Sequence, residues 1–226
     1  MHIAALNGSP HRKGNTATLM QWVLDGCAEA GASTEWLHVT DFHIEYCQGC
    51  FTCLRTGTCP IADDVPAIRE RLLNADGIVV GSPTYEGEPP AQLKTLLDRL
   101  TLLNLYTRTF EGAWTVGVAT SGVAPTSGVA KHLADFFGQR VGIIGAKTTT
   151  VARGYGALSA DDDPRLPERA RRLGRLLVAR IAHPPRRLPS PMLLWIGILR
   201  RFVVRPLVEG NPEQFGGVLA IWKEKM

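Results

Sequence analysis

Four closely spaced cysteines are the residues of this sequence best suited to metal or redox chemistry. They fall within thirteen residues, spaced C-x2-C-x2-C-x5-C with a proline after the last: Cys47, Cys50, Cys53 and Cys59. Bacterial ferredoxins hold iron–sulfur clusters with C-x2-C-x2-C-x3-C-P, which differs only in the last gap. Zinc sites usually separate two cysteine pairs by about 15–20 residues. The spacing therefore favours a four-iron cluster, with zinc and metal-free thiols as the alternatives.

A glycine-containing loop forms the second candidate site. Residues 8–16 follow the apolar run 2–6, which predicts a buried strand, and lead into the periodic run 16–30, which predicts a helix. Backbone N–H groups at a helix N-terminus attract a phosphate, and neighbouring hydroxyls and a guanidinium add donors. The residues that we expect to hold this phosphate are Ser9, Arg12, Gly14, Asn15 and Thr16.

The spacing of this loop limits which phosphate it can bind. Five residues separate Gly8 from Gly14 and Asn-Thr follows, whereas a Walker loop has four residues and then Lys-Ser/Thr. The dinucleotide pattern G-x-G-x-x-G is absent from the loop as well, which argues against an NAD site there. The single terminal phosphate of FMN is the best remaining fit.

Two further loops follow apolar runs and complete a predicted flavin site. One begins at Gly81, and we expect it to line the flavin ring with Pro83, Thr84, Tyr85, Glu86 and Gly87. The other follows the apolar run 113–120, and we expect it to close the opposite side with Thr120, Ser121 and Gly122. Backbone N–H groups in such loops can hydrogen-bond the electron-poor edge of the ring and so tune its reduction.

These motifs resemble those of flavodoxin-fold, NAD(P)H-dependent FMN reductases, and in particular their iron–sulfur flavoprotein branch. The matching segments are Gly8-Ser9-Pro10 with Gly14-Asn15-Thr16, and Ser82-Pro83-Thr84-Tyr85 with Lys94 and Asp98-Arg99. The resemblance covers roughly residues 1–155. It implies FMN as cofactor, NAD(P)H as co-substrate and ligation of a [4Fe–4S] cluster by the four cysteines. Lys94, Asp98 and Arg99 are expected to be charge pairs on a helix surface.

Strand and helix patterns alternate along most of the chain. Apolar runs predict strands at 2–6, 33–39, 77–81, 113–120 and 141–151, and periodic runs predict helices at 16–30, 64–73, 90–103, 128–137 and 164–181. This order predicts an α/β fold: a flavodoxin-like, doubly wound, five-stranded parallel sheet with a C-terminal helical extension. We predict an FMN-binding domain at 1–182, with an inserted cysteine loop at 43–60, and an arm at 183–226.

The charge is divided unevenly along the chain. Of 226 residues, 45% are hydrophobic and 20% charged, which is ordinary for a soluble globular protein. Residues 1–163 carry a net charge of −5 and residues 164–226 one of +9. The sequence shows no secretory signal pattern, so we expect a cytoplasmic protein, in which disulfides are disfavoured.

The basic C-terminal region contains an amphipathic segment. Residues 192–208 are apolar, but they are too short and too interrupted by arginine to cross a bilayer. We expect an arm that packs on the body or on another subunit of a homodimer or homotetramer. The alternative is a helix on an anionic membrane surface. Nucleic acid is disfavoured, because no pattern of stacking aromatic residues accompanies the basic ones.

Two functions agree with these motifs. The first is an FMN-dependent NAD(P)H oxidoreductase that reduces free flavin, a quinone or another small electron acceptor. The alternative is an iron–sulfur flavoprotein that carries electrons from a ferredoxin-like donor. No catalytic side chain is predicted, because the flavin itself supplies the reacting atom and the protein supplies orientation and electrostatics.

Overall fold

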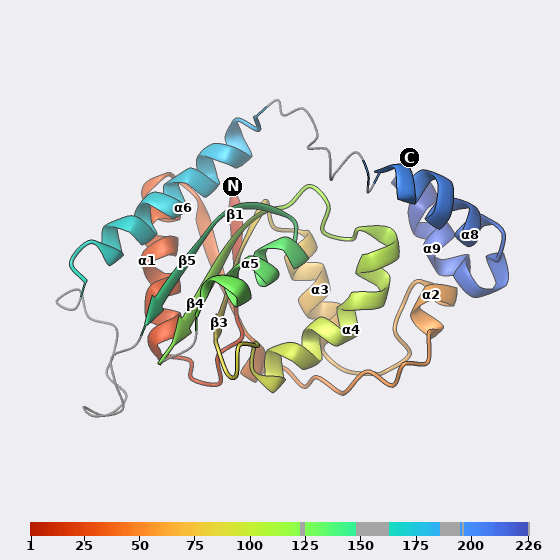
Figure 1. Ribbon diagram of the computed structural model, residues 1–226, viewed down its shortest axis with the longest axis horizontal. Helices are drawn as coiled ribbons and strands as arrows, with labels where there is room; N and C mark the ends of the chain where they lie inside the picture. Colours follow the sequence, from red (N-terminus) through yellow and green to blue (C-terminus); the bar gives the residue numbers. More distant parts are fainter. Residues whose placement is uncertain (123–124, 148–162, 186–194, 196, 226) are drawn as a thin grey trace. The chain divides into compact units, whose positions relative to one another are not determined.

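Five parallel strands form a single sheet in the order β2-β1-β3-β4-β5 (Figure 1). The strands are β1 (His2–Asn7), β2 (Ser33–His38), β3 (Gly77–Pro83), β4 (Trp114–Ser121) and β5 (Gln139–Lys147). This is the flavodoxin order, in which the winding reverses between β1 and β3. The predicted fold class is therefore confirmed. The last four residues of the predicted fifth strand, 148–151, lie outside the described residues.

The computed structural model of the protein describes residues 1–122, 125–147, 163–185, 195 and 197–225. Its contacts divide the chain into two compact units. The sheet unit comprises Met1–Ile44, Asp64–Leu96 and Phe110–Pro184, and the cysteine unit comprises Glu45–Asp63, Leu97–Thr109 and Pro185–Met226. The contacts thus group the C-terminal segment with the cysteine segment. The predicted division at residue 182 stays a prediction.

Helices cover both faces of the sheet. On one face α1 (Asn15–Glu29) and α6 (Leu166–Ala182) pack on the strands and on each other. Figure 1 shows α3 (Val65–Leu73) and α5 (Ser127–Phe136) on the other face. The central strands are buried on both sides, as their continuous apolar runs predict for a parallel sheet.

The contact between α1 and α6 depends on two glycines. A Cβ on Gly26 would lie 1.9 Å from the carbonyl oxygen of Arg171, and one on Gly174 would lie 1.9 Å from that of Val23. The two helix backbones therefore touch directly. Cys27 lies in this contact, fully buried, and burial raises the pKa of its thiol to about 12. The prediction that Cys27 is a core residue is confirmed.

The described parts of the cysteine unit are helices and loops. They include α2 (Thr52–Thr56), the end of α4 (Ala91–Thr107), a π-helical turn η3 (Arg200–Val204), α8 (Arg205–Glu209) and α9 (Pro212–Glu224). Its core consists of Leu54, Val208, Phe215 and Val218. The predicted C-terminal helical extension is confirmed by η3, α8 and α9. None of the helices in the described residues is long and apolar enough to cross a membrane.

The cysteine segment contains one short helix. α2 begins after Phe51 and ends before Gly57, and both residues have a positive φ, of 55° and 83°. α2 packs on α9 at close range, since a Cβ on Gly217 would lie 1.8 Å from the backbone nitrogen of Gly57. A further single turn, η1 (Val39–Asp41), follows β2 in the sheet unit.

Candidate functional site

The three predicted flavin loops leave the carboxyl edge of the sheet together. The register pairs Asn7 with Gly81 and Pro83 with Thr120, so the loops start from neighbouring strands. The backbone N–H of Gly8 donates to Gly81 (2.8 Å), and that of Thr84 donates to Thr120 (2.7 Å). Ligands of doubly wound sheets bind at this edge, where the strand order reverses.

A buried hydroxyl pair joins the first loop to the third. The Oγ1 atoms of Thr16 and Thr120 lie 2.7 Å apart and are both buried. Ser121, the next residue, is also buried, whereas Gly122 is exposed. The structure therefore brings together residues that are more than a hundred positions apart in the sequence, as the prediction requires.

The first loop is held in shape by its own polar groups. The backbone N–H of Ser9 donates to Oδ1 of Asn7 (3.0 Å), and Oγ of Ser9 accepts from the N–H of His11 (3.1 Å). Gly14 occupies the N-cap of α1 and provides no side-chain cap, and Asn15 opens the helix. The positive end of the helix dipole therefore lies at the loop, where a phosphate is stabilised.

Arg12, which was predicted to bind the phosphate, forms an ion pair with a neighbouring carboxylate. Its guanidinium forms an ion pair with Asp41, at the end of the turn that follows β2. The same guanidinium influences His38, whose pKa is lowered first by burial and then by the charge of Arg12. Arg12 thus has a carboxylate partner in the described residues, which fixes its position beside the loop.

The second loop makes a tight turn. Tyr85 and Glu88 exchange two backbone hydrogen bonds of 2.9 Å, and Glu86 and Gly87 between them have positive φ angles of 50° and 85°. The side chain of Tyr85 is half exposed. Thr84 is buried, and its Oγ1 has no hydrogen-bond partner among the described residues. A buried hydroxyl without a partner is costly, so Thr84 is suited to bond a ligand.

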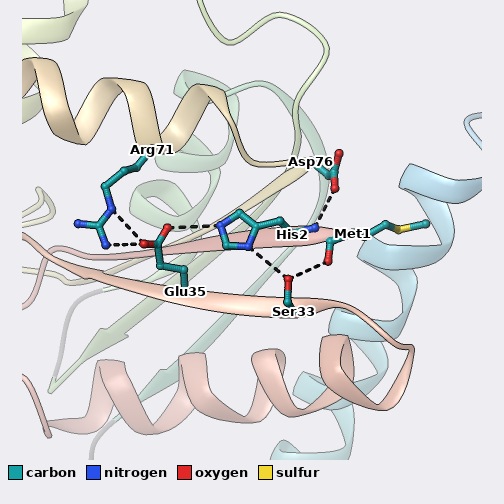
Figure 2. A network of polar contacts seen from close by, with 6 residues as sticks. All are labelled: Met1, His2, Ser33, Glu35, Arg71 and Asp76. Atoms are coloured by element: carbon teal, nitrogen blue, oxygen red, sulfur yellow. Dashed lines mark hydrogen bonds and ion pairs between the residues drawn. The ribbon is translucent and has the colours of Figure 1, made fainter.

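At the opposite edge of the sheet, where the strands begin, the polar side chains pair with one another. Figure 2 shows a chain of contacts from Arg71 through Glu35 and His2 to Ser33 and Asp76. Hydrogen bonding from Arg71, and then from His2, lowers the pKa of Glu35. This edge is a closed polar network, whereas Thr84 at the carboxyl edge keeps an unpaired hydroxyl.

The four predicted cluster ligands line one small cavity in the cysteine unit. Its walls include Cys47, Cys50, Cys53 and Cys59. Burial raises the pKa of Cys53, and the negative charges of the other three thiols raise it further, so the four sulfurs are electrostatic neighbours. Hydrogen bonds from Thr52 lower the pKa of Cys50.

Among the described residues, no three His, Cys, Asp or Glu side chains are arranged to hold one metal ion. A tetrahedral zinc site needs every sulfur about 2.3 Å from the same ion. In a four-iron cluster each thiolate binds a different iron, so its four sulfurs stay apart around a common centre. The two kinds of centre thus require different arrangements of the four thiols.

Arg99 of α4 lies in the wall of the same cavity. Its guanidinium forms a bidentate ion pair with Asp63 and also donates to the backbone carbonyl of Glu45 (2.8 Å). Both charged side chains are completely buried. Burial by itself lowers the pKa of Arg99, but the hydrogen bonds to Asp63 and the charge of Cys59 outweigh it and raise the pKa.

The expectation that Arg99 belongs to a helix-surface charge pair is therefore wrong. Lys94 and Asp98 are exposed, as expected, whereas Arg99 faces the interior. A signal was available in the sequence, because Arg99 lies on the same helical row as Leu96 and Leu103, at spacings of three and four.

Asn7, which orients Ser9, was also missed. Its only signal is a polar residue at the end of an apolar run.

The N-terminal part of the chain is similar in sequence to known proteins. Residues 1–157 match the sequence profile of the family described as NADPH-dependent FMN reductase. An iron–sulfur flavoprotein of Methanocaldococcus jannaschii is 38% identical over 130 residues, which cover 56% of this chain and 67% of that protein. An iron–sulfur flavoprotein of Archaeoglobus fulgidus is 33% identical over 123 residues, covering 54% of this chain and 60% of that one.

Solved structures agree on the fold. An NAD(P)H:quinone oxidoreductase from Methanothermobacter marburgensis superposes with a TM-score of 0.59 at 21% identity, over 81% of this chain and 98% of that one. At this identity the likeness concerns the fold alone. The two curated relatives extend beyond the part that they share with this chain.

Proposed function

The chain belongs to the NADPH-dependent FMN reductase family and is a flavoprotein oxidoreductase, and from this premise we propose that it uses FMN to pass electrons from NAD(P)H to free flavin, a quinone or another small acceptor. The observation that carries the proposal is the joining of three loops at the carboxyl edge of the sheet, with the unpaired hydroxyl of Thr84 among them.

The first loop would hold the FMN phosphate. Ser9 and Thr16 supply hydroxyls, Gly14 and Asn15 lie at the start of α1, and Arg12 adds a positive charge that is positioned by Asp41. The helix dipole and the backbone N–H groups favour a dianion at this point. Because the loop is already held by Asn7, little conformational entropy would be lost on binding.

The second and third loops would hold the flavin ring. Residues 83–87 offer a rigid turn whose backbone is fixed by the Tyr85–Glu88 bonds, and Thr120, Ser121 and Gly122 lie on the neighbouring strand end. The bound flavin supplies the hydride-accepting and electron-donating chemistry. The protein orients the ring, hydrogen-bonds its polar edge and excludes water from one side. No side chain needs to act as an acid or base.

We further propose that Cys47, Cys50, Cys53 and Cys59 hold a [4Fe–4S] cluster. Two observations support this: the four thiols line one cavity, and two relatives are called iron–sulfur flavoproteins. The buried guanidinium of Arg99 would offset part of the negative charge of four thiolates.

An electron carrier that takes electrons from a ferredoxin-like donor is the alternative function. The cysteine cavity favours it, because an NAD(P)H-dependent flavin reductase needs no iron. Either reaction would take place in the cytoplasm, where the reducing environment suits the five free cysteines.

Anaerobic purification followed by assays of flavin, iron and sulfide tests both cofactors at once. Stoichiometric FMN supports the flavin site, and four irons per chain support the cluster. Steady-state turnover then separates the two functions. Rapid NAD(P)H oxidation with a quinone or free FMN supports the reductase, whereas slow NAD(P)H oxidation beside rapid reduction by ferredoxin supports the carrier. A preparation that binds FMN but contains zinc or no metal would refute the cluster.

A further inference from the structure

An apolar stripe in the cysteine unit remains exposed to solvent. The chain is helical at residue 195 and at 197–209, and a row of large side chains along it is 40–67% exposed. The row consists of Trp195, Ile198, Leu199, Phe202, Val203 and Leu207. We call these six side chains the exposed stripe. Soluble monomers rarely leave such a row uncovered unless it binds something.

The stripe cannot turn inward without breaking contacts on the other side of the same segment. Val208 is fully buried in the small core, and Val204 packs against that core. Arg200 lies over the ring of Trp222, 5.7 Å from its centroid, and donates to the carbonyl of Tyr106 (3.4 Å). The segment is therefore anchored along one side and presents the stripe on another.

Arginine is the predominant charged residue in the sequence around the stripe. Residues 186–208 include five arginines and no aspartate or glutamate. Arg201 is exposed beside the stripe, with its guanidinium 6.0 Å from the centroid of Phe202. Arg205 pairs with Glu209 (2.7 Å), just beyond this range. An apolar row with Trp and Phe, bordered by arginine, is the pattern of helices that lie in the interface of an anionic membrane.

We propose that the exposed stripe docks this protein onto a membrane surface that contains anionic lipid. Trp195, Phe202 and their neighbours would enter the boundary between headgroups and acyl chains, and Arg201 would meet lipid phosphates. The segment would lie along the surface, because its other side is anchored through Val208 and Arg200. This proposal is independent of the cofactors proposed above.

A second copy of the chain is the competing occupant, and the charge argues against it. The common dimer symmetry places the same patch of both subunits face to face. Two copies would then bring the exposed guanidinium of Arg201, which lies beside Phe202, into the same interface twice. An anionic surface removes this repulsion, whereas a symmetric dimer creates it.

Vesicle co-sedimentation of the full-length, FMN-loaded protein tests the proposal. Vesicles of phosphatidylcholine alone are compared with vesicles that also contain phosphatidylglycerol. We expect binding to the anionic vesicles that weakens with added salt, and little binding to the neutral ones. Phe202→Ser and Arg201→Glu should each weaken binding by about tenfold, through lost apolar burial and reversed charge.

Two matched variants serve as controls in the same unit. Leu105→Ser removes a side chain as exposed as Phe202, at 68% against 67%, but outside the stripe. Lys223→Glu reverses a charge on α9 as Arg201→Glu does beside the stripe. Both controls should bind vesicles like the parent. Circular dichroism and FMN content show whether each variant is folded.

Two outcomes would overturn the proposal. One is absence of binding to anionic vesicles by the folded parent protein. The other is a parent particle of twice the chain mass that falls to the monomer mass with Phe202→Ser and ignores vesicles, which would assign the stripe to a second copy. Light scattering on the same samples distinguishes these cases.

Discussion

The two candidate cofactor sites of this protein are built in different ways. The carboxyl edge of the sheet takes its shape from strand register above a core cluster of seventeen buried side chains in the described residues. The cysteine cavity is supported by a cluster of four. It also has polar support: the buried pair of Arg99 and Asp63, and the hydrogen bond from Arg99 to the carbonyl of Glu45. Packing is extensive beneath the first site, whereas a buried ion pair supplements a small core at the second.

Cysteine replacement should give the largest difference between the sites. We expect Cys50→Ser to abolish stoichiometric iron and its broad visible absorption while FMN remains bound, because the loops proposed to hold FMN belong to the sheet unit and include none of the four cysteines. Iron and flavin assays on anaerobic protein measure this. Cys27→Ala is the matched control, since that thiol is buried between α1 and α6 and should leave iron unchanged.

Breaking the buried ion pair should have the next largest effect. Arg99→Met leaves the buried carboxylate of Asp63 without its compensating positive charge, which should lower the free energy of unfolding by about 3–5 kcal/mol. Denaturant unfolding measures the loss. Arg99→Met combined with Asp63→Leu should recover part of it, because no uncompensated charge remains.

Arg175→Met is the control for this experiment. It removes an exposed guanidinium that pairs with Glu29 and Glu168, and it should change stability little. An equally small effect of Arg99→Met would show that the cysteine unit does not depend on the buried pair, and the contrast between the two sites would fail.

A change of charge at the phosphate loop should weaken FMN binding and leave the iron content unchanged. Asn15→Asp places a carboxylate at the start of α1, against the phosphate, and should weaken FMN binding more than Thr16→Ala does. The Thr16 variant loses a charge-assisted hydrogen bond of about 1.5–3 kcal/mol, which is roughly a tenfold to hundredfold loss of affinity. Thr34→Ala, on an exposed position of β2, is the control. Titration followed by flavin fluorescence measures all three, and unchanged affinity of Asn15→Asp would remove this loop from the site.

Thr84→Val should have opposite effects on the free and the bound protein. Without FMN the unpaired buried hydroxyl is a cost, so its removal should stabilise the protein by about 1 kcal/mol. With FMN the lost hydrogen bond should weaken binding by a similar free energy. Unfolding of the apoprotein and FMN titration measure the two effects. A variant that is less stable and binds FMN normally would contradict the assignment of Thr84.

The smallest expected effect concerns the closed network at the amino edge. Hydrogen bonds from Arg71 and His2 lower the pKa of Glu35, so its contribution to stability is complete above the unfolded pKa, near 4.5, and is lost as the pH falls through the lower folded value. Glu35→Gln should flatten the acid limb of stability against pH. If the variant and the parent lose the same stability as the pH falls, this network contributes little to the pH dependence of stability.

The apolar runs of the sequence were sufficient to predict the sheet and the order of its loops. Continuous apolar runs such as 2–6 and 77–81 predicted buried parallel strands, and a parallel sheet puts the residues that follow each strand at one edge. That reasoning placed Ser9, Thr84 and Thr120 near one another. The assignment of these residues to FMN, and of the cysteines to a cluster, stays a prediction.

The sequence did not predict which polar groups are buried together, because that depends on contacts between distant segments. Arg99 was predicted on a helix surface, but the cysteine segment covers it and supplies Asp63 from thirty-six positions away. The C-terminal segment was expected to pack on the body or on another subunit; within one chain Val208 is buried while Trp195 and Phe202 are exposed, and packing on another subunit stays a prediction. Periodicity shows that a helix has an apolar side. It does not show whether another surface covers that side, because contacts distant in sequence determine this.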